Sequence, residues 1–328
     1  MELTNLTNLP LSIAVWLATD NYDHSTNPNL ISATTFNKPI RAIVLARQNK
    51  ELQKLGDIAS LIPSRFGTAL HDAIEASWIN HDNLMSVLTR MGYPEAVIKR
   101  FVVNPKQEDL TPTCIPIYLE QRAERNMGDF TVSGKFDIVI EGQLEDFKST
   151  STYSYIHGTN TQDYIRQGSI YRWLHPEIVT SDHMQIQFLF TDWSVAQSRQ
   201  SKTYPQSRIV SKTLELMSIP ETERYVKNAL DNITSLMNAT QAQLPECTPD
   251  ELWQRADVYK YYKNPEKKVR STKNYDNQAD AYMHMAKDGN VGVVDRIQGS
   301  IQRCRYCDVC EICDQAQMYV EQNLLTLT

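Results

Sequence analysis

The chain has 328 residues, of which 41% are hydrophobic and 22% are charged, and its formal net charge at pH 7 is -6. This length and composition predict a folded chain with a substantial buried core. The negative net charge excludes a uniformly basic nucleic-acid-binding surface but leaves room for a local basic channel. The sequence has neither an apolar run of about 18 residues nor a basic segment followed by an apolar one, so neither a membrane span nor a secretion signal is expected.

The hydrophobic pattern changes its period several times along the chain. Residues 65–92 have apolar residues at helical spacing, and Gly92 is the expected end of that helix. Residues 115–148 alternate with a period of two, which predicts three antiparallel strands. Residues 161–174 return to helical spacing, and residues 184–194 are expected to form a fourth strand.

This order of elements predicts an α/β fold in which helices flank a small mixed sheet. Residues 1–205 are expected to form the core, together with N-terminal helices. Residues 206–328 are mainly helical or irregular in pattern. They are expected to form a helical C-terminal extension that packs on the core and ends in a cysteine-rich segment.

The segment SGKFDIVIEGQLEDFKST carries two aspartates on neighbouring strands. A two-residue turn at EG needs positive φ, which Gly142 adopts freely, and this turn places Asp137 opposite Asp146. Like charges roughly 5 Å apart across a sheet are destabilising unless a cation lies between them. Carboxylate oxygens suit Mg²⁺ or Mn²⁺ better than Zn²⁺. Lys148 emerges on the face of Asp146 and Phe147 on the other; the alternative is that the acids are solvated on an exposed face.

Two helices carry polar pairs at helical spacing. The segment GTALHDAIE places His71 and Glu75 on one helix face, and the segment RQGSIY does the same for Gln167 and Tyr171. Each pair alone is also compatible with ordinary packing. Their order is more specific: a helix with His, a strand with Asp, a strand with Asp-x-Lys, and a helix with Gln and Tyr.

The segments GKFD and EDFK resemble the active-site signature of the PD-(D/E)XK nucleases, in which an acid precedes an acid–any–lysine triplet. With the two helices, over residues 30–175, the chain resembles the RecB-like branch of this superfamily, in the form of a stand-alone, phage-type exonuclease with a C-terminal cysteine cluster. The resemblance implies a restriction-endonuclease-like core and makes residues 1–205 the nuclease domain.

The resemblance also implies a role for each residue of the hairpin. His71, Asp137, Asp146 and the backbone carbonyl of Phe147 would bind Mg²⁺ or Mn²⁺. Lys148 would orient or deprotonate the attacking water and stabilise developing negative charge.

The other helix residues have supporting roles in this scheme. Glu75 would hold a second cation or a water molecule. Gln167 and Tyr171 would position the catalytic hairpin or contact the nucleic-acid backbone.

The segment CRYCDVCEIC places Cys304, Cys307, Cys310 and Cys313 at a uniform spacing of three. Four thiols so close together indicate a bound metal rather than disulfides. Paired C-x-x-C units are typical of Zn²⁺, and C-x-x-C-x-x-C also occurs among iron–sulfur ligands. The resemblance favours a [4Fe–4S] cluster bound by C-x2-C-x5-C. The family's first cysteine, ahead of the histidine helix, is missing here, so Cys310 or Cys114 would supply the fourth ligand.

The segment YKYYKNPEKKVRSTKNY mixes basic residues with four tyrosines and a single acid. Basic residues neutralise phosphates, and aromatic rings stack on unpaired bases, so the segment predicts a path for single-stranded nucleic acid. The alternative is a solvated charged face. The residues assigned to DNA binding are Lys260, Lys263, Lys267, Lys268, Arg270 and Lys273.

We therefore expect a divalent-metal-dependent DNA exonuclease that acts on single strands or free DNA ends in replication, recombination or repair. Its expected location is the cytoplasm, or the host-cell cytoplasm if a phage encodes the chain, and its expected protein partner is a recombination or replication factor. Two alternatives stay open. One is an RNA endonuclease with a similar His, acid, acid, Lys arrangement, and the other is a non-catalytic nucleic-acid-binding protein organised by the cysteine metal.

Overall fold

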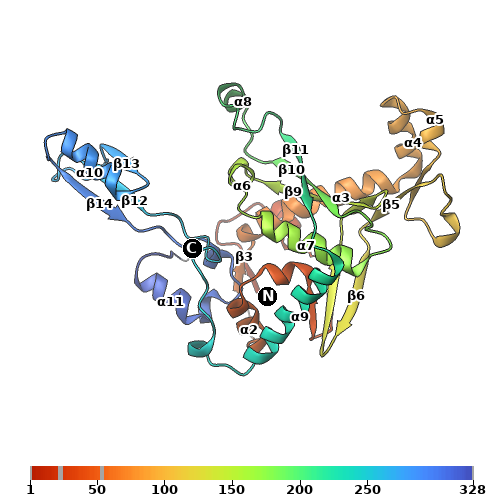
Figure 1. The fold of residues 1–328 in the computed structure, drawn as a ribbon, viewed down its shortest axis with the longest axis horizontal. Coiled ribbons are helices and arrows are strands. Elements are labelled where there is room, and N and C mark those ends of the chain that lie inside the picture. Colours follow the sequence, from red (N-terminus) through yellow and green to blue (C-terminus); the bar gives the residue numbers. More distant parts are fainter. Residues whose placement is uncertain (1, 21–24, 52–54, 327–328) are drawn as a thin grey trace. The chain divides into compact units, whose positions relative to one another are not determined.

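The computed structural model describes residues 2–20, 25–51 and 55–326, and every element below lies within these ranges (Figure 1). The chain forms two compact units. The first consists of Met1–Asn37 and Glu51–Asp231, and the second of Lys38–Lys50 and Asn232–Thr328. Residue 205, the predicted domain boundary, therefore lies inside the first unit, and a short N-terminal segment belongs to the second.

The first unit is built on a mixed sheet of six strands, in the order β11-β10-β9-β8-β5-β4 within the described chain. The strands are β4 (Phe101–Val103), β5 (Ile115–Leu119), β8 (Ile138–Ile140), β9 (Gln143–Thr150), β10 (His183–Phe190) and β11 (Ile209–Glu215). The pairs β9–β10 and β4–β5 are parallel, and the other neighbours are antiparallel. Because parallel neighbours need a crossover, β9 and β10 are joined through α6 (Thr152–His157) and α7 (Thr161–Leu174). The predicted mixed sheet flanked by helices is confirmed.

Two smaller sheets complete the strands of this unit. The strands β2 (Leu30–Ser32), β7 (Phe130–Lys135) and β6 (Arg122–Met127) form one of them, and β1 (Glu2–Thr4) pairs with β3 (Leu55–Asp57) in the other.

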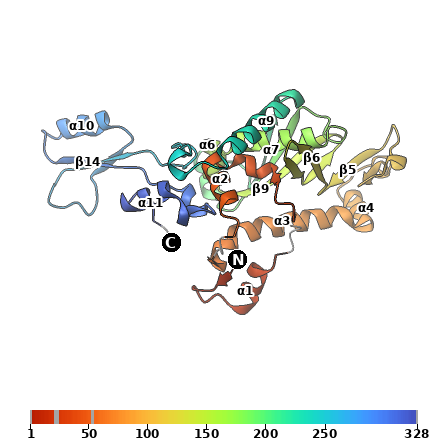
Figure 2. The ribbon, with the colours of Figure 1, turned by 90° about the horizontal axis from the view of Figure 1, so that it is seen from below.

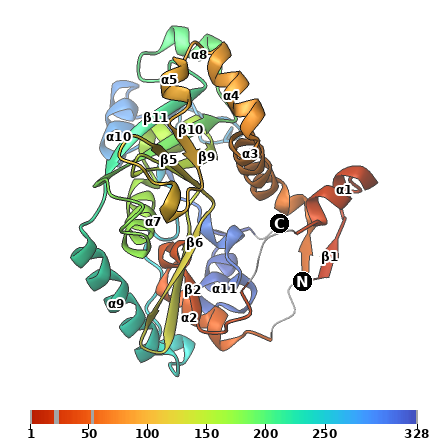
Figure 3. The same ribbon diagram turned by 90° about the vertical axis from the view of Figure 1, so that its right-hand side faces the viewer.

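The helices α3 (Ile62–Ile79) and α7 lie on opposite faces of the main sheet (Figures 2 and 3). The helix predicted over residues 65–92 is two helices, because Asn80 is extended and its side chain caps α4 (His81–Arg90) by accepting a hydrogen bond from the Asn83 N–H. The other helices are α1 (Leu11–Ala18), α5 (Glu95–Ile98), α8 (Val195–Gln200) and α9 (Ile219–Leu236), with 3-10 turns at Ala33–Asn37, Ile58–Leu61 and Gln107–Asp109. Among the described residues, no helix combines the length and apolar character needed to cross a bilayer.

Close packing holds α7 against its neighbours. A Cβ atom at Gly134 in β7 would lie 2.8 Å from the Cδ1 atoms of both Tyr171 and Leu174, which is closer than real contacts allow. Only glycine therefore lets α7 approach β7 so closely. Trp173 of the same helix is fully buried. This packing fixes the position of the α7 residues that face the site.

The second unit contains both helices and a sheet. Its helices are α2 (Ile40–Gln48), α10 (Gln278–Lys287) and α11 (Asp314–Glu321), with 3-10 turns at Gln241–Gln243, Arg303–Tyr306 and Cys310–Ile312. The strands β13 (Lys273–Tyr275), β12 (Val258–Tyr262) and β14 (Val293–Ile297) form an antiparallel sheet in that order. The pattern after residue 205 was interpreted as mainly helical or irregular, and it did not predict the strands β11 to β14. The strands β12 to β14 are short, and in β12 and β13 lysines and tyrosines mask the alternation that marks a strand.

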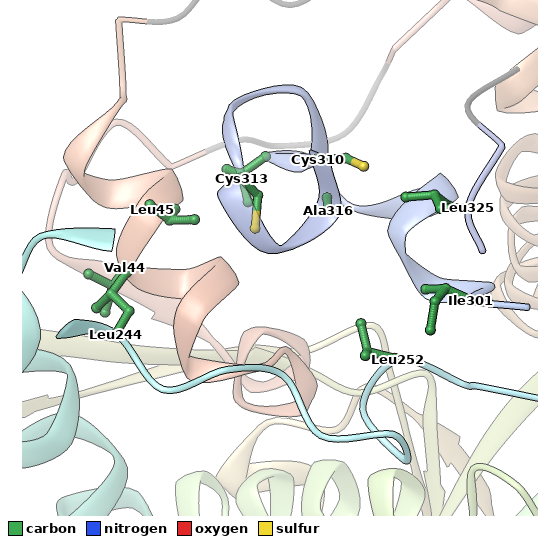
Figure 4. Close-up of a cluster of buried hydrophobic side chains, with 10 residues drawn as sticks. Val44, Leu45, Leu244, Leu252, Ile301, Cys310, Cys313, Ala316 and Leu325 are labelled. Carbon is green, nitrogen blue, oxygen red and sulfur yellow. The ribbon is translucent and has the colours of Figure 1, made fainter. Parts of the chain in front are cut away.

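An apolar cluster forms the core of the second unit (Figure 4). It brings together segments that are far apart in the chain: Val44 and Leu45 of α2, Leu244, Leu252, Ile301, and the C-terminal residues Val309, Cys310, Cys313, Ala316 and Leu325. The cysteine-rich segment is thus part of a packed core.

Candidate functional site

The site begins on one long β-hairpin, residues 115–140, that changes from one sheet to another half-way along. The outer strands β5 and β8 pair in the main sheet, and β6 and β7 pair in the three-stranded sheet, with one register throughout. Where the sheet changes, the N–H of Glu120 donates to the carbonyl oxygen of Asp137 at 3.0 Å. Glu120 has φ 50°, a left-handed conformation that is costly for a residue other than glycine. The hairpin therefore holds Glu120 opposite Asp137.

The turn and register predicted for the aspartate hairpin are present. Ile140 pairs with Gln143 across a two-residue turn, in which Glu141 and Gly142 have φ of 49° and 83°. Continued by one residue beyond the Ile138–Glu145 pair, this β8–β9 register places Asp137 beside β9 at Asp146. Asp137 Oδ2 accepts a hydrogen bond from the Phe147 N–H at 3.0 Å.

Three side chains meet here with the geometry of a metal site. His71 of α3, Glu120 and Asp137 each offer one ligand atom, and these atoms lie within 4.8 Å of one another. His71 Nδ1 is 3.4 Å from Asp137 Oδ1, and its Nε2 is 3.0 Å from the carbonyl oxygen of Phe147. Lys135 forms an ion pair with Glu120. One imidazole and two carboxylates form a donor set suited to a divalent cation.

Strand β9 contributes a second group of residues next to the first. Lys148 Nζ is 2.6 Å from Asp146 Oδ2, which confirms that the two side chains share a face. Gln167 Nε2 of α7 donates to Asp146 Oδ1 at 3.4 Å and to Tyr171 Oη at 2.7 Å. Phe147 faces the other way and packs against a buried cluster around Ile138.

Burial and neighbouring charges shift the pKa of each ionisable group in the site. The hydrogen bond to Asp137 raises the pKa of His71 to about 9, although burial opposes this. Burial disfavours ionisation of Asp137, but His71, Lys148 and the Phe147 N–H together outweigh burial and lower the Asp137 pKa. Burial raises the pKa of Asp146 to about 6, and that of Glu120 also rises. Burial opposes the charged form of Lys148, yet the charge of Asp146 raises its pKa. Each acid of the site thus lies beside a basic side chain.

A cavity of about 800 Å³ opens onto the metal-ligand group. Its lining includes the site residues His71, Glu75, Glu120, Asp137 and Tyr171, and also Trp16, Arg65, Thr68, Asp72, Arg122, Ser133 and Lys135. Lys148 lies away from this lining, with its Nζ 5.5 Å from the ring centre of Tyr164 on α7. The described structure thus has a ligand group that faces the cavity and an Asp146–Lys148 pair behind it.

The structure brings together every side chain that the sequence assigned to catalysis, although their catalytic roles stay predictions. These are His71, Glu75, Asp137, Asp146, Lys148, Gln167 and Tyr171. Glu120 was missed. It lies next to Asp137 only because the hairpin turns at Gly128, whose φ is 58°. The dipeptide Gly–Asp at residues 128 and 129 marks this turn in the sequence. Counting outward from it along both strands would have paired Glu120 with Asp137.

The four cysteines of the C-terminal segment lie in the core of the second unit, together with a fifth that the sequence analysis missed. Cys247 packs on the same apolar cluster. Its N–H donates to Gln315 Oε1 at 2.8 Å, and its carbonyl oxygen accepts from Gln315 Nε2 at 3.0 Å. Gln315 is buried in the first turn of α11, the helix that begins directly after Cys313. These two bonds hold Cys247 beside the C-terminal thiols.

Buried polar contacts surround these thiols. Arg41 of α2 is 4% exposed, and its Nε donates to Cys313 Sγ at 3.3 Å. Burial raises the pKa of the Cys247 thiol to about 12, and Cys313, Cys304 and Cys307 add to the shift. In Figure 4, the sulfur atoms of Cys310 and Cys313 point in different directions. All six cysteines lie in the described part of the chain as free thiols, and no three of their sulfur atoms lie within 4.8 Å of one another.

The basic segment predicted to bind DNA forms β12, β13 and the loop between them. Tyr261 is fully buried and Tyr262 nearly so, so these two rings cannot stack on bases. Lys263 pairs with Asp288 at 3.3 Å, and Lys268 with Asp295 at 2.7 Å. DNA binding by this segment stays a prediction.

Comparison with known proteins does not identify a family for this chain. No family model matches the sequence, and no curated protein matches it. A crystal structure of SSO0001 is similar over 70% of this chain and 86% of that chain, with 17% identity and a TM-score of 0.39. A phage-related exonuclease from Haemophilus somnus 129PT is similar over 37% of this chain and 60% of that chain, with 16% identity and a TM-score of 0.26. At these scores neither similarity supports a functional conclusion.

The ion pair between His71 and Asp137 predicts a pH-dependent stability. His71 has a pKa of about 9 in the metal-free fold and 6.5 as its ordinary value. Its stabilising contribution is therefore complete below pH 6.5 and lost as the pH rises to 9. With about 1.36 kcal/mol per pKa unit, the difference in unfolding free energy between wild type and His71→Asn should shrink by at most about 3 kcal/mol across this window.

Urea unfolding in EDTA measures this difference. His183→Asn is the matched control, because His183 is an exposed histidine that also contacts an aspartate, Asp182. Parallel pH profiles for wild type and His71→Asn would show that the ion pair does not form.

Proposed function

We propose that this chain is a divalent-metal-dependent nuclease that hydrolyses phosphodiester bonds in DNA, acting on single strands or free ends in replication, recombination or repair. One observation carries the proposal. A His–Glu–Asp ligand group faces a cavity of about 800 Å³ and lies directly beside a buried aspartate–lysine pair. Phosphodiester hydrolysis needs a polarised phosphate, an activated water and compensation of negative charge, and such an arrangement is suited to all three.

The donor set fits Mg²⁺ or Mn²⁺. Glu120 and Asp137 supply hard carboxylate oxygens, and His71 supplies one nitrogen, which Mn²⁺ accepts more readily than Mg²⁺. When bound, such a cation acts as a Lewis acid toward a phosphate oxygen and increases the acidity of coordinated water. Glu75, one helical turn beyond His71 on α3, lines the same cavity and is placed to accept a hydrogen bond from a water molecule there.

Lys148 supports the ligands from behind the cavity. Its raised pKa favours the ammonium form, so a role in charge compensation is better supported than a role as a base. The charge of Lys148 contributes to the lowered pKa of Asp137 and so keeps this ligand ionised. Asp146 holds the ammonium group, and Gln167, itself held by Tyr171, holds Asp146.

In the hydrolysis, the oxygen of a water molecule forms a bond to phosphorus while the bond from phosphorus to the bridging oxygen breaks. The water gives up a proton to a base, and the leaving oxygen takes one up. Among the cavity residues, Glu75 is our candidate for the base. Negative charge on the phosphate oxygens would be compensated by the cation site and by Lys135, which lines the cavity, while Lys148 keeps Asp137 ionised.

We also propose that Cys247 completes a metal site with Cys304, Cys307 and Cys313. A Zn²⁺ ion with Zn–S bonds of about 2.3 Å requires tightly grouped sulfur atoms, whereas the thiols here are spaced more widely. The C-x2-C-x5-C spacing of Cys304, Cys307 and Cys313 is our reason for proposing a [4Fe–4S] cluster, with Zn²⁺ as the alternative. Arg41, whose buried guanidinium donates to Cys313 Sγ, would offset the negative charge of the thiolates.

Two substitutions test the nuclease site. Glu120→Gln and Lys148→Ala should each lower Mn²⁺-dependent cleavage of labelled single-stranded DNA at least about hundredfold, because one removes a ligand and the other removes a compensating charge. The matched controls are Glu124→Gln, an exposed glutamate on the neighbouring strand, and Lys227→Ala, an exposed lysine of the same unit.

The same assay with duplex DNA, RNA and EDTA separates the alternatives. Cleavage of RNA alone would identify an RNA endonuclease, and binding without cleavage would identify a non-catalytic binding protein. Full activity in both site variants would refute the assignment of the site.

The cysteine proposal is tested by metal analysis of the purified protein. Cys247→Ser should lose most of its bound iron, measured per chain together with visible absorption, because a ligand is missing. Cys114→Ser should retain it. Full iron content in Cys247→Ser, or stoichiometric zinc in a colourless wild type, would contradict the proposal.

A further inference from the structure

The end of the cavity away from the ligand group has a different chemistry. The α3 residues that line the cavity run from Arg65 in the first turn to Glu75, a span of about 15 Å along the helix axis at 1.5 Å per residue. Helix α1 lies beside the start of α3 and contributes Trp16 to the same lining. The cavity thus joins the ligand group to an aromatic side chain.

Two aromatic rings are exposed at this outer end. Trp16 is 37% exposed and Phe66 is 58% exposed. Their ring centres are 5.6 Å apart with an interplanar angle of 83°, so the edge of one ring supports the face of the other. An indole held in this way presents a fixed, flat apolar surface to the cavity.

Cations line the cavity on both walls. Arg65 is anchored by the bond from its Nε to the carbonyl oxygen of Leu17 at 2.9 Å, and its Nη1 is 3.6 Å from Asp20. Arg122 and Lys135 line the opposite wall, on β6 and β7. Flat apolar surface flanked by cations complements a nucleotide, whose base is flat and whose phosphates are anionic.

We infer that the outer end of the cavity is a subsite for an unpaired base of a DNA strand: Trp16, supported by Phe66, stacks on the base, and Arg65 and Arg122 lie along its phosphates. The inference rests on the proposed function, because it assumes that the DNA strand bound at the outer end of the cavity continues to the ligand group at the other end. A base inside a duplex has both faces covered by its neighbours and cannot stack on Trp16. The subsite therefore selects single strands or frayed ends.

The test uses the full chain in EDTA, where binding is measured without metal-dependent cleavage. Trp16→Leu keeps an apolar helix residue but removes the flat ring, and it should weaken binding of a fluorescent oligo-dT strand by about 5- to 150-fold. Binding of a covalently closed circular duplex, which has no terminal base pair, should change by less than about twofold, because stacking does not contribute there. Trp16→Phe should restore most of the affinity.

Trp253→Leu is the matched control, because Trp253 is 41% exposed and lies beside Arg303 in the other unit. Equal oligo-dT affinity of Trp16→Leu and wild type, or an equal loss for duplex and single strand, would overturn the subsite. If Trp16→Leu does not fold, Phe66→Leu must give the same selective loss, and an unchanged affinity there overturns the inference. Trp16-dependent binding without any Mn²⁺-dependent cleavage would refute the nuclease proposal and retain the subsite.

Discussion

The site depends on the pairing of three buried or half-buried acids with three cations. Asp137 lies against His71, Glu120 against Lys135, and Asp146 against Lys148. Uncompensated carboxylates this close together would be expensive to bury, and each pair offsets that cost. A divalent cation would change the charge balance at the Asp137–His71 and Glu120–Lys135 pairs. To bind it, His71 must give up its proton, and Lys135 must give up its contact with Glu120. Metal binding, proton release and movement of Lys135 are therefore expected to be linked.

Two hairpins and two helices enforce this arrangement. The register of residues 115–140 holds Glu120 opposite Asp137, and the turn at Glu141–Gly142 brings β9 alongside. From opposite faces of the sheet, α3 supplies His71 and α7 supplies Gln167 (Figure 3). Because α3 also runs along the cavity to Arg65, one rigid helix connects the ligand group with the outer aromatic end.

Local rules of chain geometry predicted much of the site. Counting outward from Gly142 gave the register of β8 and β9, and the alternation of strand faces placed Lys148 with Asp146 and apart from Phe147. Helical spacing gave α7 with the bounds that the structure shows. These features depend only on residues that are close in sequence.

The missed features depend on contacts that local patterns do not define. Glu120 reaches Asp137 through a hairpin that crosses between two sheets, and Cys247 reaches the C-terminal thiols through the side chain of Gln315. The tyrosine-rich segment had the composition of a nucleic-acid path, yet Tyr261 is core. Composition alone does not distinguish a ring that stacks on bases from one that packs inside a sheet.

The most direct test of the central claim is a crystal soaked in Mn²⁺ and measured at the manganese absorption edge. The account predicts an anomalous peak within bonding distance of His71, Glu120 and Asp137, and a displaced Lys135 ammonium group. A crystal in which this position holds no peak at saturating Mn²⁺, while the three side chains stay accessible, would contradict it.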